Sequence, residues 1–510
     1  MKKPTLIKII FPFFLLILLI PQILVQTGCA NIIPPEGGSR DSLPPVLRRA
    51  NPGDSSRNFN DNKITLTFDE YVNADNYLQE MIVSPVPANM PNVTRKLNTV
   101  TVKLRDTLEP NTTYTINFGK TIKDVNEGNP LKNFTYIFST GSYIDSLEFT
   151  GNVLLAETGV TDTTLTVLLH KTNIDSALIK EKPRYVAKLD GRGNFRFKNL
   201  PPGTFYVYAL KDEGGSYRYM SKTQLFAFSD SSVTINRDTK PVTLYAYAGK
   251  ETSPPVKPAT GTTRNTKPAD KRLKFSTSLS GDRQDLLDKF RMTFESKLKS
   301  FDTSKVHFTT DTIFSPLSGY EWEMDSTKKI MTLDFPWQEN VLYSLVLEKD
   351  FAVDTFGYQL LKADTINFKA KGKKDYGKLL IRFRNLDLSQ NPVLLFVQNN
   401  EVKKSFPLSS VNFSQELFIP GDYNLRLLND RNQNGIWDPG VFFGKQRQQP
   451  ELVKPIQRTL NIRADRDNSF DVDVNAVAPK ESDKNQPTQN PVLRGRSNNN
   501  TRPTNRSGNN

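Results

Sequence analysis

Residues 99–140 hold the pattern that most constrains how this chain can fold. Three short runs, 100–104, 114–118 and 134–138, alternate apolar with polar residues and are rich in β-branched and aromatic side chains. Such period-two alternation is typical of strands that bury one face of a sheet. Segments containing Pro and Asn separate the runs and favour turns. The stretch therefore predicts three consecutive strands of a β-sandwich.

The same succession of strands and turns returns later in the chain. Tyr114 corresponds to Tyr343 at an offset of 229, and Phe138 corresponds to Phe368 at an offset of 230. An offset that holds over a whole strand–turn–strand–loop–strand unit indicates a duplicated domain.

Residues 285–299 fit two different patterns. Apolar residues fall near a helical period at Leu286, Leu287, Phe290, Phe294 and Leu298. Against that, residues 290–295 align with residues 64–69 at an offset of 226, close to the offsets above. Because the duplication is the stronger constraint, we predict a strand here.

A second type of unit follows each of these domains. Residues 193–209 contain a Gly-Asn turn, an alternating strand, a Pro-Pro-Gly turn and another strand, and residues 418–427 repeat the second half. Gly203 corresponds to Gly421 and Asp212 to Asp430, both at an offset of 218. We therefore predict an all-β chain of four tandem sandwiches, arranged as two copies of a two-domain pair.

The first unit resembles the bacterial (SbsA-type) Ig-like domain of S-layer and cell-envelope proteins, especially Bacteroidetes lipoproteins. The resemblance rests on residues 41–46, 51–52, 64–70, 108–114 and 137–140, and it is looser in the second copy. The other units resemble the transthyretin-like sandwich of carboxypeptidase regulatory domains, through the pattern G-x-F-x-F-x-x-L-x-P-G-x-Y. These resemblances imply Ig-like and transthyretin-like folds and a place in the cell envelope, and they imply no activity.

These patterns divide the chain into eight segments. We expect a signal peptide at 1–28, a tether at 29–45, Ig-like domains at 46–141 and 272–371, transthyretin-like domains at 147–247 and 377–475, a Pro/Thr/Lys-rich linker at 248–271 and a disordered basic Asn-rich tail at 476–510.

Residues 1–29 have the features of a lipoprotein signal. Three lysines precede a short apolar run at 9–19, and Gly28 precedes Cys29, the one cysteine of the chain. The run is shorter than a spanning helix requires. Residues 25–29 resemble a bacterial lipobox, although Gln26 departs from its usual leucine, and this implies that Cys29 is acylated. The alternative is a free thiol in an uncleaved leader.

The formal charge of +14 does not indicate a basic groove. Residues 1–28 contribute +3, residues 249–274 contribute +5 and residues 476–510 contribute +4, which leaves +2 for the folded units. No stacking aromatic residues accompany these basic stretches, so nucleic acid is not an expected partner.

The loop that begins at Asp430 is the one candidate metal site in the sequence. Oxygen-bearing residues at relative positions 1, 3, 5 and 9, with Gly at position 6, match an EF-hand-type calcium loop, whose position 7 binds through its backbone carbonyl. The residues are Asp430, Asn432, Asn434, Ile436 and Asp438. Position 12 is Val441 instead of Glu, so an oxygen from elsewhere would be needed. The alternative is an Asn-Gly hairpin tip that needs no ion.

No motif indicates catalysis or requires a cofactor. The two histidines, His170 and His307, lie in strand-like runs, and no H-E-x-x-H, G-x-S-x-G or phosphate-loop motif occurs. A carboxylate pair assembled by the fold remains open. Exposed aromatic residues on β-sandwiches can bind glycans, and the candidates are Tyr217, Tyr219, Trp322, Trp337 and Trp437. The alternative for each of them is packing at a core or its rim.

Taken together, the sequence predicts a non-enzymatic cell-envelope lipoprotein that acts as a structural, scaffold or adhesion module. The alternative is a glycan-binding or glycan-processing lipoprotein. We expect an outer-membrane location, facing the periplasm because no acidic cluster follows Cys29. The expected partners are the membrane, through the lipid anchor, and an envelope glycan or protein.

Overall fold

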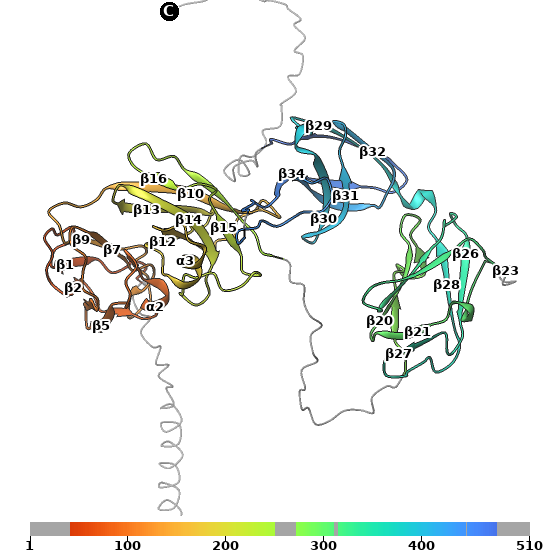
Figure 1. Cartoon of the computed structure of the whole chain (residues 1–510), viewed down its shortest axis with the longest axis horizontal. Coiled ribbons are helices and arrows are strands. Elements are labelled where there is room, and N and C mark those ends of the chain that lie inside the picture. Colours follow the sequence, from red (N-terminus) through yellow and green to blue (C-terminus); the bar gives the residue numbers. More distant parts are fainter. Residues whose placement is uncertain (1–40, 250–271, 311–314, 445, 477–510) are drawn as a thin grey trace, which may run out of the picture.

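The computed structural model describes residues 41–249, 272–310, 315–444 and 446–476. Cys29, the predicted signal peptide, most of the predicted linker and nearly all of the predicted tail lie outside these ranges. The described chain consists of β-strands with two short α-helices, α2 (Tyr77–Glu80) and α3 (Asp175–Lys180), and three 3-10 turns. The predicted all-β class and its tandem sandwiches are confirmed (Figure 1).

Sandwich 1 is formed by β1 to β9. Its sheets have the strand orders β1-β2-β6-β5, β4-β7-β9 and β3-β8. The strands are β1 (Leu47–Asn51), β2 (Lys63–Phe68), β3 (Val72–Ala74), β4 (Ile82–Ser84), β5 (Asn92–Lys96), β6 (Thr99–Lys103), β7 (Thr113–Asn117), β8 (Ile122–Asp124) and β9 (Thr135–Ser139). Alternate residues of β2 and β6 are buried, as their period-two patterns predict.

Sandwich 3 repeats this arrangement with β18 to β28. Its sheets are β18-β20-β25-β24, β19-β28-β26-β22-β23 and β21-β27. The predicted strand over residues 290–295 is confirmed, since β20 pairs with β25 and buries every second residue. The strands are β18 (Phe275–Thr277), β19 (Arg283–Gln284), β20 (Phe290–Phe294), β21 (Leu298–Phe301), β22 (Val306–Thr310), β23 (Ser315–Pro316), β24 (Glu321–Met324), β25 (Ile330–Asp334), β26 (Leu342–Leu347), β27 (Ala352–Asp354) and β28 (Asp364–Ala370).

Sandwich 2 is formed by β10 to β17. One sheet has the order β13-β10-β17, in which β10 and β17 are parallel, and the other has the order β12-β11-β14-β15 with β16 also on β14. The strands are β10 (Leu147–Leu155), β11 (Leu165–His170), β12 (Tyr185–Lys188), β13 (Asn194–Leu200), β14 (Gly203–Lys211), β15 (Phe226–Phe228), β16 (Val233–Ile235) and β17 (Val242–Ala246).

Sandwich 4 repeats the topology of sandwich 2. Its sheets are β32-β29-β35, again with one parallel pair, and β31-β30-β33-β34. The strands are β29 (Gly377–Arg384), β30 (Pro392–Gln398), β31 (Glu401–Pro407), β32 (Asn412–Phe418), β33 (Gly421–Asn429), β34 (Leu452–Ile462) and β35 (Asp467–Asp473). The described chain is therefore two copies of a pair of sandwiches.

Each sandwich encloses its own hydrophobic core, and a further buried cluster joins sandwich 2 to sandwich 4. In that cluster Phe442, from the loop between β33 and β34, lies 5.6 Å from the ring of Tyr208 and 5.1 Å from that of Phe226, both in sandwich 2. Arg447 pairs with Asp175 of α3. We call this contact the seam.

The seam places sandwich 4 between sandwiches 2 and 3, although the chain passes through sandwich 3 first (Figure 1). The amide of Gln449 donates to the carbonyl of Phe228 at 3.0 Å, and the N–H of Val453 donates to the carbonyl of Ala156 at 2.8 Å. Burial of aromatic rings is the main contribution to such a contact.

Within the described residues, no helix has the length and apolar character needed to cross a membrane.

Candidate functional site

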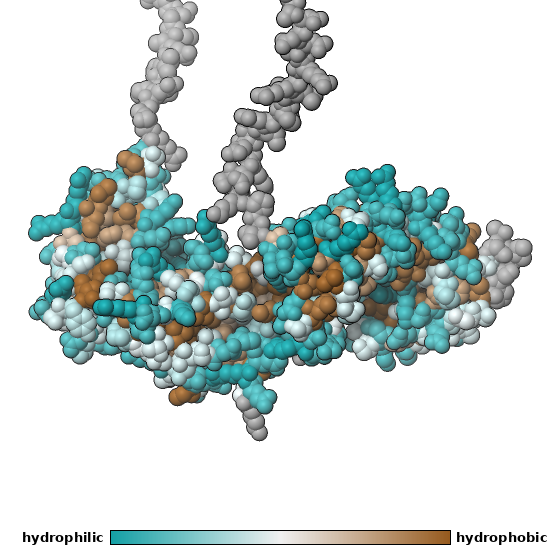
Figure 2. All heavy atoms as spheres, turned by 90° about the horizontal axis from the view of Figure 1, so that it is seen from above, coloured by the Kyte–Doolittle hydropathy of each residue, from teal (hydrophilic) through white to brown (hydrophobic). Residues whose placement is uncertain are grey.

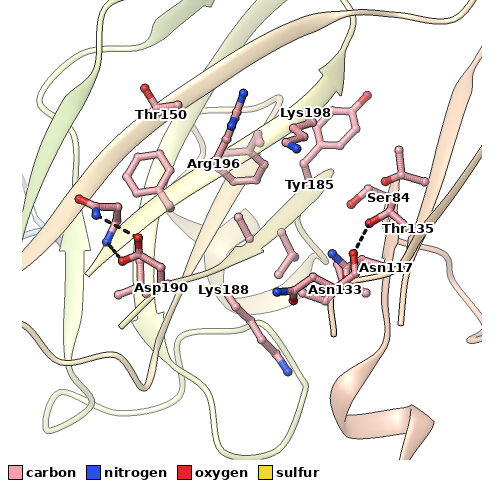
Figure 3. Close-up of a pocket in the computed structure, with 18 of the residues that line it drawn as sticks. Ser84, Asn117, Asn133, Thr135, Thr150, Tyr185, Lys188, Asp190, Arg196 and Lys198 are labelled. Atoms are coloured by element: carbon pink, nitrogen blue, oxygen red, sulfur yellow. Dashed lines mark hydrogen bonds between the residues drawn. The ribbon is translucent and has the colours of Figure 1, made fainter. Parts of the chain in front are cut away.

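A cleft of about 1080 Å³ lies between sandwich 1 and sandwich 2 (Figure 3). One wall is the outer face of the β4-β7-β9 sheet, whose alternate residues point away from the core of sandwich 1. These include Ser84, Asn117 and Thr135. Since its volume exceeds that of most small-molecule pockets, the cleft has room for part of an extended ligand.

The opposite wall is the open side of sandwich 2. It is made by β12 and β13, which are the outermost strands of their two sheets. Tyr185 and Phe197 are almost fully buried there and close the core behind the wall. Arg196 and Lys198 alternate with the buried residues of β13 and reach into the cleft (Figure 3).

Several polar side chains of the cleft already form hydrogen bonds with other groups of the chain. Gly119 donates its N–H to Oδ1 of Asn117 at 2.8 Å, and Thr135 donates to the carbonyl of Asn133 at 3.2 Å. Asn194 donates its amide to Asp190, and this bond is the main cause that holds the pKa of Asp190 below its usual value. Asp190 is therefore an ionised turn residue.

The charged groups of the cleft are mainly cations. Lys188 pairs with Glu80 across the two sandwiches at 3.6 Å, and Arg196 pairs with Glu148 at 2.7 Å. Lys120 and Lys198 also line the cleft and form no ion pair with other described residues. Of the two acids in the cleft, Glu80 is paired with Lys188 and Asp190 accepts hydrogen bonds within its turn. The cleft is therefore suited to a polar or acidic ligand.

The two histidines lie in different sandwiches. His170 is buried in sandwich 2, where burial lowers its pKa to about 4, and its ring meets that of Tyr208 edge-on. His307 is exposed on sandwich 3, with Nε2 2.8 Å from Oε1 of Glu348. Neither histidine lines the cleft, so neither can act as an acid or base there.

The Asp430 loop is a turn closed by its own hydrogen bonds. Asp430 is buried and accepts the N–H of Gly435 at 2.7 Å and that of Asn434 at 3.3 Å. The amides of Asn432 and Asn434 both donate to Oδ2 of Asp438, at 2.6 and 2.9 Å. Ile436 is exposed and donates its N–H to Asn434.

Glu451, a buried carboxylate at this loop, was not among the residues predicted from the sequence. Glu451 accepts the N–H of Arg431 at 2.8 Å and that of Asp438 at 3.1 Å. Its position just before β34 gave no signal, because calcium-loop spacing ends well before it. Among the described residues no group of three or more His, Cys, Asp or Glu side chains is placed to hold a metal ion. Calcium at this loop stays a prediction.

The five aromatic candidates do not form an exposed row. Each is partly buried against a hydrophobic cluster. Trp322 and Trp337 pack on the core of sandwich 3, whereas Tyr217, Tyr219 and Trp437 pack at the seam. Packing therefore accounts for all five.

Residues 41–140, about a fifth of the chain, match the family model of a bacterial Ig-like domain. No curated protein matches the chain. Similar solved structures include the N-terminal part of the bacterial S-layer protein SbsC, with 16% identity, 41% of this chain and 45% of that chain covered, and a TM-score of 0.15.

Two further structures are similar at the same level. The TIE protein of Bacillus anthracis shows 11% identity over 86% of this chain and 75% of that chain, with a TM-score of 0.15. BcpA, the major pilin subunit of Bacillus cereus, shows 10% identity over 64% of this chain and 99% of that chain, with a TM-score of 0.15. This chain spans less than half of the first structure, and all these values are too low to indicate what it binds.

Proposed function

We propose that this protein is a lipid-anchored structural or adhesion component of a bacterial cell envelope. The observation that carries the proposal is that direct contacts join the sandwiches at every joint, so the described chain forms a continuous string. A string of packed β-sandwiches suits a spacer or a scaffold better than it suits a catalyst.

The joint between sandwiches 1 and 2 shows how these contacts are made. Arg184 of sandwich 2 forms a bidentate ion pair with Glu109 of sandwich 1, and its hydrogen bonds lower the pKa of Glu109. The N–H of Val86 donates to the carbonyl of Arg184 at 2.9 Å. The side chain and the backbone carbonyl of Arg184 therefore both hold the joint.

The joint between sandwiches 3 and 4 is built around Asp285. Tyr376 donates to Oδ1 of Asp285 at 2.8 Å, and Lys371 pairs with Oδ2 at 3.0 Å. Lys404 of sandwich 4 also pairs with Asp288 at 2.9 Å. The side chains of Lys371 and Asp285 are mostly buried, so salt screens this pair less than an ordinary surface ion pair.

Two parts of the proposal rest on sequence resemblance. The lipobox-like residues before Cys29 support acylation and an outer-membrane location facing the periplasm. The repeated Gly-Asn and Pro-Gly turns support a transthyretin-like assignment for sandwiches 2 and 4, as modules that pack or bind. Two or more acyl chains on Cys29 would give stable anchoring.

Labelling of cells expressing the full chain with a radioactive fatty acid tests the anchor. Cys29→Ala should abolish the label on the protein, whereas a conservative change elsewhere in the leader, Thr5→Ser, should not. Undiminished labelling of Cys29→Ala would contradict the anchor.

A second candidate function is glycan binding at the cleft between sandwiches 1 and 2. The observation that favours it is the cleft of about 1080 Å³, lined by amides, hydroxyls and two lysines, Lys120 and Lys198, that form no ion pair with other described residues. A glycan array with the full chain and with Lys198→Ala tests it, with Lys362→Ala, an exposed lysine of sandwich 3, as the control. Binding that Lys198→Ala reduces would support the cleft, and equal binding by both variants would exclude it.

A further inference from the structure

The end of sandwich 1 where the described chain begins exposes five large apolar side chains. Their exposed fractions are 69% for Leu43, 53% for Val46, 60% for Tyr71, 61% for Leu97 and 51% for Val125. We call these five residues the apolar tip. Hydrophobic residues reach the surface of this sandwich at the left of Figure 2. Single exposed apolar residues are common, but five at one end need an explanation.

Hydrogen bonds show that the five residues belong to one end of the sandwich. They lie on the entering chain, the turn before β3, the turn between β5 and β6, and the loop after β8. The bonds run from Val125 N to Tyr71 O (3.1 Å), from Val72 N to Leu97 O (3.1 Å), from Asp69 N to Val46 O (3.1 Å) and from Asn129 Nδ2 to Leu43 O (3.2 Å).

Sandwich 3 provides an internal control, because its backbone makes the same bonds with different side chains. The corresponding bonds run from Thr355 N to Lys297 O (2.9 Å), from Leu298 N to Lys328 O (2.8 Å) and from Glu295 N to Lys274 O (3.1 Å). Lysine thus stands where sandwich 1 has Val46, Tyr71 and Leu97. All three lysines are exposed.

The comparison shows that the fold does not require apolar side chains at these positions. Sandwich 3 does expose Phe356 and Leu361 in the loop after β27, at 70% and 67%. Those two side chains belong to one loop beside lysines, whereas the apolar tip gathers side chains from four separate segments. Apolar residues that the fold does not need, gathered from several loops, are typical of a contact surface.

The position of the apolar tip in the chain indicates what it contacts. Asp41, the first described residue, follows Cys29 closely in the sequence. The short segment between them, fully extended, spans at most about 42 Å, so an acylated Cys29 keeps this end of sandwich 1 close to the bilayer. A tether of this length also raises the effective concentration of the lipid surface at the tip. Sandwich 3, which carries the lysines, is much farther along the chain.

The charges around the apolar tip indicate the kind of lipid. Asp41, Glu70 and Glu127 lie on the same segments, as does Asp69, which pairs with Arg48 at 3.6 Å. The pKa of Glu70 is raised, by burial first and then by its acidic neighbours. An acidic rim is repelled by anionic headgroups and tolerates zwitterionic ones.

We propose that the apolar tip inserts into the interface of a zwitterionic lipid bilayer and holds sandwich 1 end-on to the membrane. The proposal rests on the proposed anchoring through Cys29, which brings the tip to the surface. Tyr71 suits such a boundary because its ring is apolar and its hydroxyl reaches water.

Vesicle flotation tests the proposal. The chain carries Cys29→Ala and lacks residues 2–28, so that neither an acyl chain nor the apolar leader contributes, and the vesicles are phosphatidylcholine with phosphatidylethanolamine. Val46→Lys/Tyr71→Lys/Leu97→Lys introduces the residues that sandwich 3 has at these positions, so it should fold. It should lower vesicle binding by roughly tenfold or more, since each large apolar side chain removed from lipid costs binding free energy.

The matched control is Phe356→Lys/Leu361→Lys, which removes the exposed apolar residues at the same end of sandwich 3. This variant should bind as the Cys29→Ala chain does. Phosphatidylglycerol is left out because it would attract the basic residues 249–274 and 476–510 of every variant.

Two results would overturn the proposal: no flotation of the Cys29→Ala chain, and equal flotation of that chain with and without the triple substitution. Neither depends on acylation, which fatty-acid labelling in cells tests separately.

Discussion

Sandwiches 2 and 4 share one topology but use the outer face of their second sheet differently. In sandwich 2 the outer face of β12-β11-β14-β15 is covered by the seam, whereas in sandwich 4 the corresponding face carries a smaller cluster that includes Trp437. The difference arises from one pair of corresponding loops. In sandwich 2 the loop between β14 and β15 covers residues 212–225, whereas in sandwich 4 the loop between β33 and β34 is longer and covers residues 430–451. The longer loop of sandwich 4 thus covers the outer sheet face of sandwich 2 and forms the seam.

The two loops nevertheless begin with the same turn. Asp212 accepts the N–H groups of Ser216 and Tyr217, at 3.2 and 2.7 Å, as Asp430 accepts those of the residues four and five positions on. The shared turn forms in sandwich 2 without the other oxygen ligands. Its geometry is therefore a backbone requirement, and the added oxygen side chains of sandwich 4 are a separate feature.

The largest effect is expected from removing the ring at the centre of the seam. Phe442→Ala should lower the free energy of unfolding by about 3–5 kcal/mol, because it empties a buried aromatic site between Tyr208, Phe226 and Phe228. It should also separate the two halves and increase the radius of gyration in small-angle scattering. Phe356→Ala, at an exposed position of sandwich 3 away from the seam, is the control. An unchanged melt and radius would show that the seam does not hold the halves together.

The next largest effect is expected from the loss of stability at low pH caused by His170 of sandwich 2, which sandwich 4 lacks. His170 pairs with Tyr206 in sandwich 2, and Val397 pairs with Asn424 in sandwich 4. Because Tyr206 corresponds to Asn424 at the offset of 218, Val397 stands where sandwich 2 has the buried His170. Nε2 of His170 is buried without a hydrogen-bond partner. Its pKa of about 4 lies below the usual 6.5, so the unfolded chain binds the proton more readily.

Stability should therefore be complete above about pH 6.5 and fall by up to ~3 kcal/mol as the pH drops to 4. His170→Val should abolish that part of the acid sensitivity, as measured by melts at pH 8, 6 and 4.5. If the variant and the parent lost stability in parallel, another group would be responsible.

A smaller effect is expected at the two aspartate turns. Asp430→Ala should destabilise the protein by about 1.5–3 kcal/mol, because two backbone N–H groups lose a charged acceptor in a buried turn. Asp212→Ala, in a less buried turn, should cost less. Melts with excess calcium and with chelator then separate the two copies. A calcium-dependent rise that disappears in Asp430→Ala and persists in Asp212→Ala would establish the predicted site, and no rise would reject it.

The smallest effect is expected beyond sandwich 4. Deleting residues 477–510 should leave the melting temperature unchanged, because their composition lacks the apolar residues needed for a core. A clear fall in melting temperature would show that these residues pack against one of the sandwiches.

The sequence predicted the sandwiches because period-two alternation reports directly which face of a strand is buried. The same reasoning, with the duplication, correctly preferred a strand at Phe290–Phe294. It could not predict the seam, since Phe442 lies in an irregular loop and contacts rings of a sandwich far earlier in the sequence. Adjacent Phe residues in a loop rich in Gly and Gln were the available signal.

The cleft was missed for a related physical reason. In the sequence, Arg196 and Lys198 have the pattern of solvent-facing residues of an ordinary strand. In the structure, sandwich 1 lies opposite them, so both residues line the cleft. The aromatic candidates show the reverse case, because Trp437 is covered by neighbours that local sequence cannot reveal.

The seam has a mechanical consequence. Tension between Cys29 and a partner bound to sandwich 3 would pass through the seam, with residues 250–271 as a second, parallel connection. The ring contacts and the few hydrogen bonds of the seam would break before any strand was pulled from its sheet. That second connection would then take up the tension over at most about 77 Å. The chain would lengthen and shorten again without unfolding, and force spectroscopy should record this as a first, reversible step.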